Sequence, residues 1–248
     1  GRYANSRLAY AWVRPAMRGT DRRKTGLPLS SAWKEEDHRD DTLRGTAAEL
    51  REDVLRLRKI QSWHLLESPV EARFAYRLDL RRERDGQWAK ERVVIGDEKY
   101  ALFLRASKPP TRLQPRFIYV FTIDSHGRSF LLFGTSSVEN RYPLPLTPGQ
   151  TYPAADISLG PTATFDIAPP YGIDTYFLLT TDEPLPNPRI LEWEGVRAGA
   201  PRPQTALEEL LLLTATGSRA RRPATPSMWS IERVFFEAVP PRESRTSR

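Results

Sequence analysis

The sequence has 248 residues, a mass of 28.4 kDa and a formal net charge of +7, from 38 basic and 31 acidic side chains. It contains no cysteine, which excludes disulfides, thiolate metal sites and a cysteine nucleophile in this chain. Its three histidines leave few candidates for a general base. Composition therefore argues against an enzyme, and we expect no catalytic residue, no cofactor and no metal site.

Six tryptophans, nine tyrosines and ten phenylalanines are enough to build a sizeable core, which argues against wholesale disorder. No stretch reaches the roughly 18 consecutive apolar residues of a membrane span, and the N-terminus lacks the layout of a signal peptide. We therefore expect a soluble, cytoplasmic protein without a membrane partner. Because the sequence lacks an initiator methionine, we also expect it to be a piece of a longer chain.

The basic residues are unusual in kind, because 32 of the 38 are arginine and six are lysine. Arginine is a planar, bidentate donor, so one interpretation is recognition of phosphates or carboxylates. Codon bias in a GC-rich genome would give the same count. The arginines are spread over predicted helices, strands and loops, which favours codon bias over a nucleic-acid footprint.

Residues 1–45 carry mixed charges without hydrophobic periodicity, which predicts a basic arm or linker. Trp12 and Trp33 lie in this arm, and tryptophan is costly to expose. We therefore expect parts of the arm to pack on a core, either in this chain or in a neighbouring domain.

Residues 46–64 are predicted to form an amphipathic helix. Thr46 and Glu49 have the spacing of a capping box at its start. The expected apolar face recurs every three or four residues and consists of Leu43, Leu50, Val54, Leu57 and Ile60. The cations that face elsewhere are Arg51, Arg56, Arg58 and Lys59. We expect this helix to dock on its neighbour, and a helix that reads nucleic acid is the less favoured alternative.

From Ala72 onward the period changes to two, as in a strand buried on one face. The alternating apolar residues are Phe74, Tyr76, Leu78 and Leu80. Turns at 84–87 and 96–99 join this strand to runs at 88–95 and 100–104, which predicts a three-stranded meander. Residues 117–123 are apolar at nearly every position, as expected of a central strand covered on both faces. Further strands are predicted at 129–133, 162–167, 175–180 and 229–239.

A second capping box, at Thr205 and Glu208, predicts one short late helix. Many short strands and few helices predict a mainly β fold, namely an antiparallel β-sandwich with one N-terminal amphipathic helix and the short late helix. The predicted organisation is an arm over 1–45, a helix over 46–64, a β-sandwich domain over 70–239 and a disordered tail over 240–248.

Asp124, Ser125 and His126 have the residue types of a hydrolytic triad, but they are consecutive and lie at a predicted hairpin turn. A triad requires three side chains that converge in order, which neighbouring turn residues rarely achieve. A turn capped by the Asp side chain explains the same residues and is favoured. Of the other histidines, His38 is expected to be solvated in the arm, and His64 suits the dipole of a helix end.

Two basic clusters lie in surroundings rich in Gly, Pro, Ser and Thr, and are predicted to be exposed loops. They consist of Arg22, Arg23 and Lys24, and of Arg219, Arg221 and Arg222. Exposed loops are accessible to proteases, so these are candidate processing sites. Contact with a polyanion is the other interpretation, and the sequence leaves both open.

Three stretches, residues 119–133, 170–180 and 229–237, together resemble a bacterial module of unassigned function. That module commonly lies C-terminal to a caspase-like cysteine peptidase domain of the caspase/metacaspase family, and the similarity covers about residues 46–239. The resemblance implies a non-catalytic module whose parent carries the Cys–His dyad outside this chain. Residues 1–45 would then be the connection to the peptidase domain, or its end.

The leading hypothesis is therefore a regulatory, docking or substrate-presenting module of a bacterial caspase-like peptidase. Its partner would be the upstream caspase-like domain or another protein, and loops 18–26 and 217–224 would be cleaved if that domain prefers basic residues. The alternative is an Arg-rich domain that binds nucleic acid or another polyanion, with affinity that falls steeply as salt rises. A third hypothesis is a cysteine-free hydrolase centred on His126.

Overall fold

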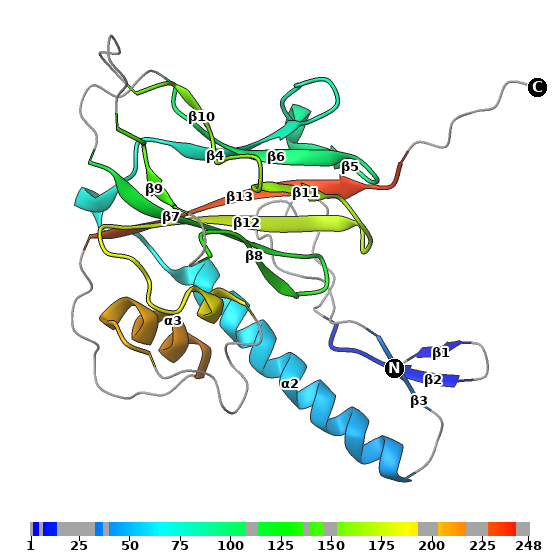
Figure 1. The fold of residues 1–248 in the computed structure, drawn as a ribbon. Helices are drawn as coiled ribbons and strands as arrows, with labels where there is room; N and C mark the ends of the chain where they lie inside the picture. Colours follow the sequence, from blue (N-terminus) through cyan, green and yellow to red (C-terminus); the bar gives the residue numbers. More distant parts are fainter. Residues whose placement is uncertain are drawn as a thin grey trace, which may run out of the picture.

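The computed structural model describes nine stretches of the chain. They are residues 2–4, 7–13, 33–36, 40–107, 114–135, 139–145, 153–192, 203–216 and 228–241. Among the described residues, 40% are in strands and 22% in helices, so the predicted mainly β class is confirmed. Figure 1 shows strands β4–β13 (residues 77–239) stacked in two layers, with the two α-helices on one side of them and β1–β3 (residues 2–36) apart.

The smaller sheet is built around one central strand, β6. β4 pairs with one edge of β6, while β10 and β11 share the other edge, one after the other. All these pairings are antiparallel. The strands are β4 (Arg77–Arg82), β6 (Lys99–Arg105), β10 (Asp156–Ser158) and β11 (Thr164–Asp166).

The larger sheet has the strand order β5-β13-β12-β7-β8, and β9 pairs with the other end of β7. Its pairings are antiparallel except for β5, which runs parallel to β13. The strands are β5 (Val93–Ile95), β7 (Arg116–Ile123), β8 (Ser129–Phe133), β9 (Arg141–Tyr142), β12 (Gly172–Thr181) and β13 (Trp229–Val239).

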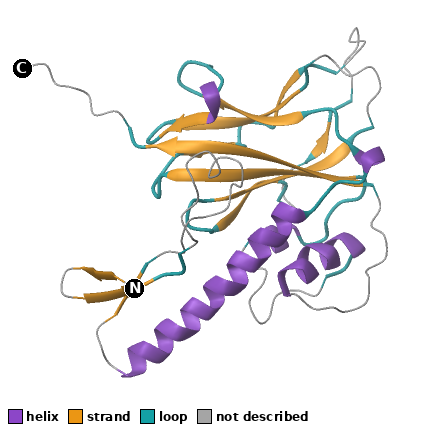
Figure 2. Ribbon diagram, turned by 180° about the vertical axis from the view of Figure 1, so that it is seen from behind, coloured by secondary structure: helices purple, strands orange, loops and turns teal. Residues whose placement is uncertain are grey.

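Two hydrophobic cores lie on the two faces of the larger sheet. The first fills the space between the sheets and includes Leu80, Leu104, Val120, Leu178 and Phe236. The second lies between the larger sheet and the helices, which are α2 (Asp40–Leu65), α3 (Ala206–Thr216) and the short η3 (Pro188–Leu191). Its rings include Trp63, Phe121 and Phe177, with centroids 4.9 Å apart for Trp63–Phe121 and 4.7 Å for Phe121–Phe177. The predicted β-sandwich is therefore present, with helices as a third layer (Figure 2).

The predicted three-stranded meander is wrong in its middle strand. The chain turns at Asp85–Gly86, where Gly86 has a φ of +66°, and its strand pairing with β4 is limited to an isolated bridge between Arg81 and Trp88. It then passes through the short η2 (Lys90–Arg92) and enters β5, which joins β13 in the other sheet. β4 and β6 consequently pair with each other directly.

The helix predicted over 46–64 begins six residues earlier, at Asp40. Thr46 is buried inside α2, so it does not cap the helix. Lys59, predicted to face solvent, is only 2% exposed: its Nζ donates to the carbonyls of Ile190 (2.7 Å) and Glu192 (2.9 Å). The late helix begins as predicted, because Thr205 Oγ1 accepts a hydrogen bond from the Glu208 N–H at 3.1 Å.

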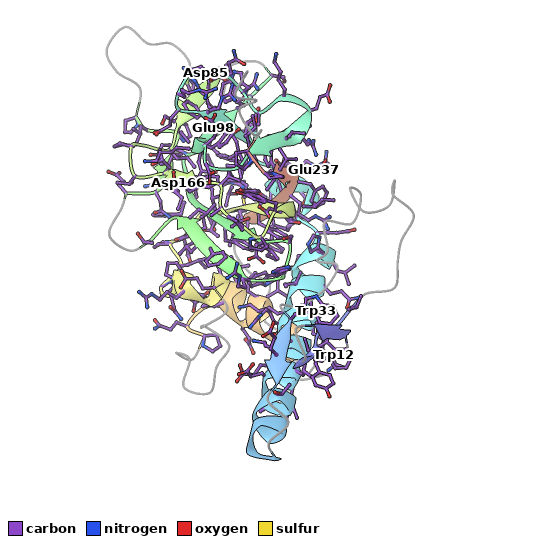
Figure 3. The ribbon with its side chains drawn as sticks, turned by 90° about the vertical axis from the view of Figure 1, so that its right-hand side faces the viewer. Trp12, Trp33, Asp85, Glu98, Asp166 and Glu237 are labelled. Carbon is purple, nitrogen blue, oxygen red and sulfur yellow. The ribbon has the colours of Figure 1, made fainter. Side chains whose placement is uncertain are left out.

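Parts of the predicted arm form a small antiparallel sheet that the sequence analysis does not predict. Its strands are β1 (Arg2–Ala4), β2 (Arg7–Tyr10) and β3 (Lys34–Glu36), in that order. The indole N–H of Trp12 donates to the Leu50 carbonyl of α2 at 2.8 Å, and Lys34 pairs with Glu49 at 3.2 Å. Figure 3 shows Trp12 and Trp33 beside α2, whereas the labelled acidic residues Asp85, Glu98, Asp166 and Glu237 belong to the sandwich.

Candidate ligand groove

A groove runs along the side of the sandwich where β4 of the smaller sheet faces β13 of the larger sheet. Its volume is about 1060 Å³, and an adjoining cavity of about 350 Å³ reaches inward to Leu178. The size suits a peptide segment or a large ligand. We call it the edge groove, and its polar lining is formed mainly by Glu67, Ser68, Arg73, Arg77, Asp79, Glu91, Arg92, Arg105, Glu232 and Arg233.

One wall of the edge groove is a stretch of β13 that has a strand neighbour on one side only. β12 pairs with the whole of β13, but β5 pairs on the other side only with residues 237–239. At the opposite end of this stretch, the Ser68 hydroxyl accepts from the Ile231 N–H (2.8 Å) and donates to the Ile231 carbonyl (3.1 Å). Between Ser68 and β5, residues 232–236 of β13 have no neighbour among the described strands on this side, and we call them the open edge.

Backbone groups of a paired strand point alternately to its two sides. Because both backbone groups of Ile231 point to the Ser68 side, those of Arg233 and Phe235 point to the same, open side. Within the described part of the chain, no backbone hydrogen bond fills this side at Arg233 or Phe235. The open edge therefore presents two N–H donors and two carbonyl acceptors in strand geometry, and of these two residues Arg233 lines the groove.

Three exposed arginines line the groove beside this open edge: Arg73 before β4, Arg77 at the start of β4, and Arg92 at the end of η2. Within the described residues, none of the three forms an ion pair within 4 Å. Arg105 differs, because it pairs with Asp79 at 2.6 Å and with Asp156 at 3.3 Å. The three guanidinium groups are thus available to an anion.

Glu232 lies on the face of β13 that points between the sheets. It shares this face with Val234 and Phe236 of the inter-sheet core, because residues two apart on a strand point to the same side. Burial raises the pKa of Glu232, while the positive charges of Arg77 and Arg73 oppose that rise. The carboxyl group at the inner end of the groove thus takes up a proton more readily than an ordinary glutamate.

The Asp124–Ser125–His126 turn is a structural turn in this fold. Asp124 Oδ1 accepts from the backbone N–H groups of His126 (2.9 Å) and Arg128 (2.8 Å), and its Oδ2 accepts from Arg128 Nε at 2.7 Å. The Ser125 hydroxyl donates to the Pro170 carbonyl at 3.2 Å, and not to a histidine. The arrangement contains none of the ordered contacts of a triad.

The same turn is anchored to β12 by a carboxyl group that the sequence analysis does not single out. The Ser125 N–H donates to Asp174 Oδ1 at 3.0 Å. Burial raises the pKa of Asp174 to about 7, aided by the negative charge of Asp124, although the Ser125 N–H opposes the rise. Two stretches of the family resemblance, 119–133 and 170–180, therefore meet at this contact.

The structure places the other sequence candidates away from the edge groove or outside the described residues. Arg22, Arg23 and Lys24, like Arg219, Arg221 and Arg222, lie outside the described residues, and so does His38. His64 is buried at the end of α2, where its ring stacks on Phe235 with centroids 6.3 Å apart. Its carbonyl accepts a hydrogen bond from Arg233.

Sequence reasoning missed the residues of the edge groove for a specific reason. In the sequence, Arg73 and Arg77 alternate with the apolar residues of the strand predicted from Ala72 onward, and Glu232 lies within the strand predicted at 229–239. A signal was present in Glu232, a charge in an otherwise largely apolar strand. Its meaning depends on which strand edges stay open, and that is decided by long-range pairing.

In the described part of the chain, no group of three or more acidic or histidine side chains could hold a metal ion. None of the helices described here is long and apolar enough to cross a membrane. Comparisons with protein-family models, with curated proteins and with solved structures find no match to this chain. The geometry of the edge groove is therefore the basis on which a function can be proposed.

Proposed function

We propose that this chain is a non-catalytic docking module, and that its edge groove binds an extended segment of a protein partner. The observation that carries the proposal is the open edge of β13 between Ser68 and β5. An extended peptide that adds to an open sheet edge gains main-chain hydrogen bonds, and pockets beside the edge select its side chains. Both features are present in one groove.

The dimensions of the opening set the length of the segment. Residues 232–236 span about 16 Å, since a strand rises roughly 3.3 Å per residue. A partner segment of about five residues would fill this length. The adjoining cavity of about 350 Å³ would hold one of its side chains. Apolar and charged residues line it, namely Leu78, Leu178, Ile231, Val234, Arg77, Arg92, Glu232 and Arg233.

The resemblance to modules of caspase-like peptidases bears on the identity of the partner. Its three stretches contain the β7–β8 hairpin and most of β12 and β13. The third stretch includes Glu232 and Arg233 of the groove wall. In the proposal, the partner is accordingly the upstream caspase-like domain or a protein that this domain acts on.

Nucleic-acid binding is the less favoured function, although one surface has suitable residue types. On the smaller sheet of the sandwich, Arg105 of β6 lies 4.1 Å from the Trp88 ring centroid, and Arg81 of β4 lies 5.3 Å from the ring centroid of Phe103. Arg105 is already bound to two carboxylates there, Asp79 and Asp156. This reduces the attraction for a phosphate backbone.

The test uses the full chain and three fluorescein-labelled extended hexapeptides, one acidic, one neutral and one basic, with fluorescence polarisation as the readout. Two variants are compared. Arg233→Pro removes the open-side N–H and the side chain, whereas Arg233→Ala removes only the side chain. An open-side N–H makes no bond to β12, so proline costs the sheet little there.

The proposal predicts that at least one peptide binds, and that Arg233→Pro loses far more affinity than Arg233→Ala. Amide hydrogen exchange of the unmodified protein gives a second readout, because the N–H groups of Arg233 and Phe235 should become protected when peptide binds. No binding by any peptide, or no added protection at these amides, would overturn the docking function.

A further inference from the structure

The charges around the edge groove indicate which kind of segment it binds. Arg73, Arg77 and Arg92 point to one opening, and the described residues leave all three without an ion pair. Resting on the docking function above, we propose that the bound segment is acidic. Its carboxylates bind the guanidinium groups of these three arginines while its backbone pairs with β13 at Arg233.

Acidic residues also line the groove, and they decide how strong the preference is. Glu67 and Glu91 are exposed at its rim, whereas Glu232 is half-buried at its inner end. Asp79 is committed to Arg105. A charge at an exposed rim is strongly screened, while Glu232 is disfavoured as an anion by its burial. The same screening applies to the three exposed arginines, so the preference rests on their number, three against the two rim glutamates, and on the burial that disfavours Glu232 as an anion.

The backbone that carries Arg92 is held in an uncommon conformation. Glu91 and Arg92 both have positive φ angles, of 50° and 60°, which non-glycine residues rarely adopt. Such residues cost free energy and persist where surrounding structure fixes them, most often at binding and functional sites. The turn diverts the chain away from the β13 edge just before β5, leaving the edge open and Arg92 beside it.

Glu232 makes the affinity for an acidic segment depend on pH. A carboxylate brought next to Glu232 disfavours its ionised form, so binding is accompanied by proton uptake. Affinity should therefore rise as pH falls, as long as the peptide carboxylates stay ionised. Arg77 and Arg73 are the positive charges that act on Glu232. The other charged residues that line the groove are Arg92, Arg105, Arg233, Glu67, Asp79 and Glu91.

The test measures the three hexapeptides against the full chain and four variants, namely two single substitutions, their combination and a control. Arg73→Ala and Arg77→Ala should each weaken the acidic peptide by about fivefold, and the double variant by more than tenfold. Arg84→Ala is the matched control with the same change in net charge: Arg84 pairs with Glu98 at 2.8 Å outside the groove, so affinity should stay within about twofold.

Glu232→Gln separates an acidic occupant from a basic one, because the two predict opposite signs. With an acidic peptide the variant should bind several-fold more tightly, and the rise in affinity as pH falls should disappear. If the basic or neutral peptide binds best, or if Glu232→Gln weakens the acidic peptide, the acidic preference is overturned. The docking function then still stands on the Arg233→Pro comparison, so the two failures are distinguishable.

Discussion

The buried Lys59 gives the most demanding test of how the helical layer is attached to the sandwich. Its ammonium group is bound to two carbonyls at the end of η3, those of Ile190 and Glu192, and lies 4.4 Å from the ring centroid of Trp63. Lys59→Met keeps the length of the side chain and its apolar stem. The substitution therefore removes the charge and both hydrogen bonds while largely preserving the packing.

The size of the effect follows from opposing contributions. Hydrogen bonds from a charged donor each contribute about 1.5–3 kcal/mol, and the buried Ile190 carbonyl would be left without this donor. Removing a buried ammonium group also relieves its desolvation cost, which offsets part of the loss. We expect a net loss of about 2–3 kcal/mol in the free energy of unfolding. With an m-value of roughly 2–3 kcal/mol per molar urea, the midpoint should fall by about 1 M.

Urea unfolding followed by tryptophan fluorescence and circular dichroism measures this midpoint. Lys99→Met is the matched control, because Lys99 is exposed on β6, and its midpoint should stay near that of the unmodified protein. A Lys59→Met variant as stable as the unmodified chain, or more stable, would refute the reasoning. Desolvation would then outweigh the two hydrogen bonds.

Three further results are expected. Burial and the charge of Asp124 raise the pKa of Asp174 to about 7, whereas an aspartate in an unfolded chain has a pKa of about 3.9. Between these two values the folded state binds a proton at Asp174 that the unfolded state does not, so the free energy of unfolding should fall as pH rises through this range. Asp174→Asn should abolish this fall in unfolding experiments across that range, and an unchanged pH dependence would rule Asp174 out as its source. Thr205→Ala should cost about 1 kcal/mol, because it removes the oxygen that accepts the Glu208 N–H at the start of α3, while Thr205→Ser should retain most of the stability. The purified chain should not hydrolyse Arg-, Lys- or Asp-terminated peptide reporters; turnover that is lost in His126→Ala would restore the hydrolase hypothesis.

The strands were the most predictable part of the fold, because burial leaves a local pattern. The run 117–123 is apolar at nearly every position because β7 is covered by the smaller sheet of the sandwich on one face and by the helical layer on the other. The alternation from Phe74 to Leu80 likewise matches the buried face that leads into and along β4. Local patterns do not reveal pairing partners, and for that reason β5 was assigned to the wrong sheet.

The errors in α2 have a related cause. A capping box shows that Thr46 and Glu49 could begin a helix, yet the residues before them can also be helical, and glycine at position 45 costs only about 1 kcal/mol. Lys59 was placed outside because a one-sided helix buries a single stripe. α2 contacts both the large sheet and α3, so its buried arc is wider and includes Lys59 next to Ile60.

The edge groove was beyond local sequence reasoning, because it is defined by contacts that are not made. Ser68 and β5 come from distant parts of the chain and together leave residues 232–236 open. In the sequence, Arg73, Arg77 and Arg92 cannot be told apart from ordinary surface arginines. Only the folded chain shows that they line the same groove.

The most direct test of the account is hydrogen exchange at the two open-edge amides, Arg233 and Phe235, with and without the acidic hexapeptide. The account predicts that both become protected upon binding, and that the protection is lost when Arg73 and Arg77 are both replaced by alanine. Exchange at these amides that does not change at saturating acidic, neutral and basic peptide would contradict it.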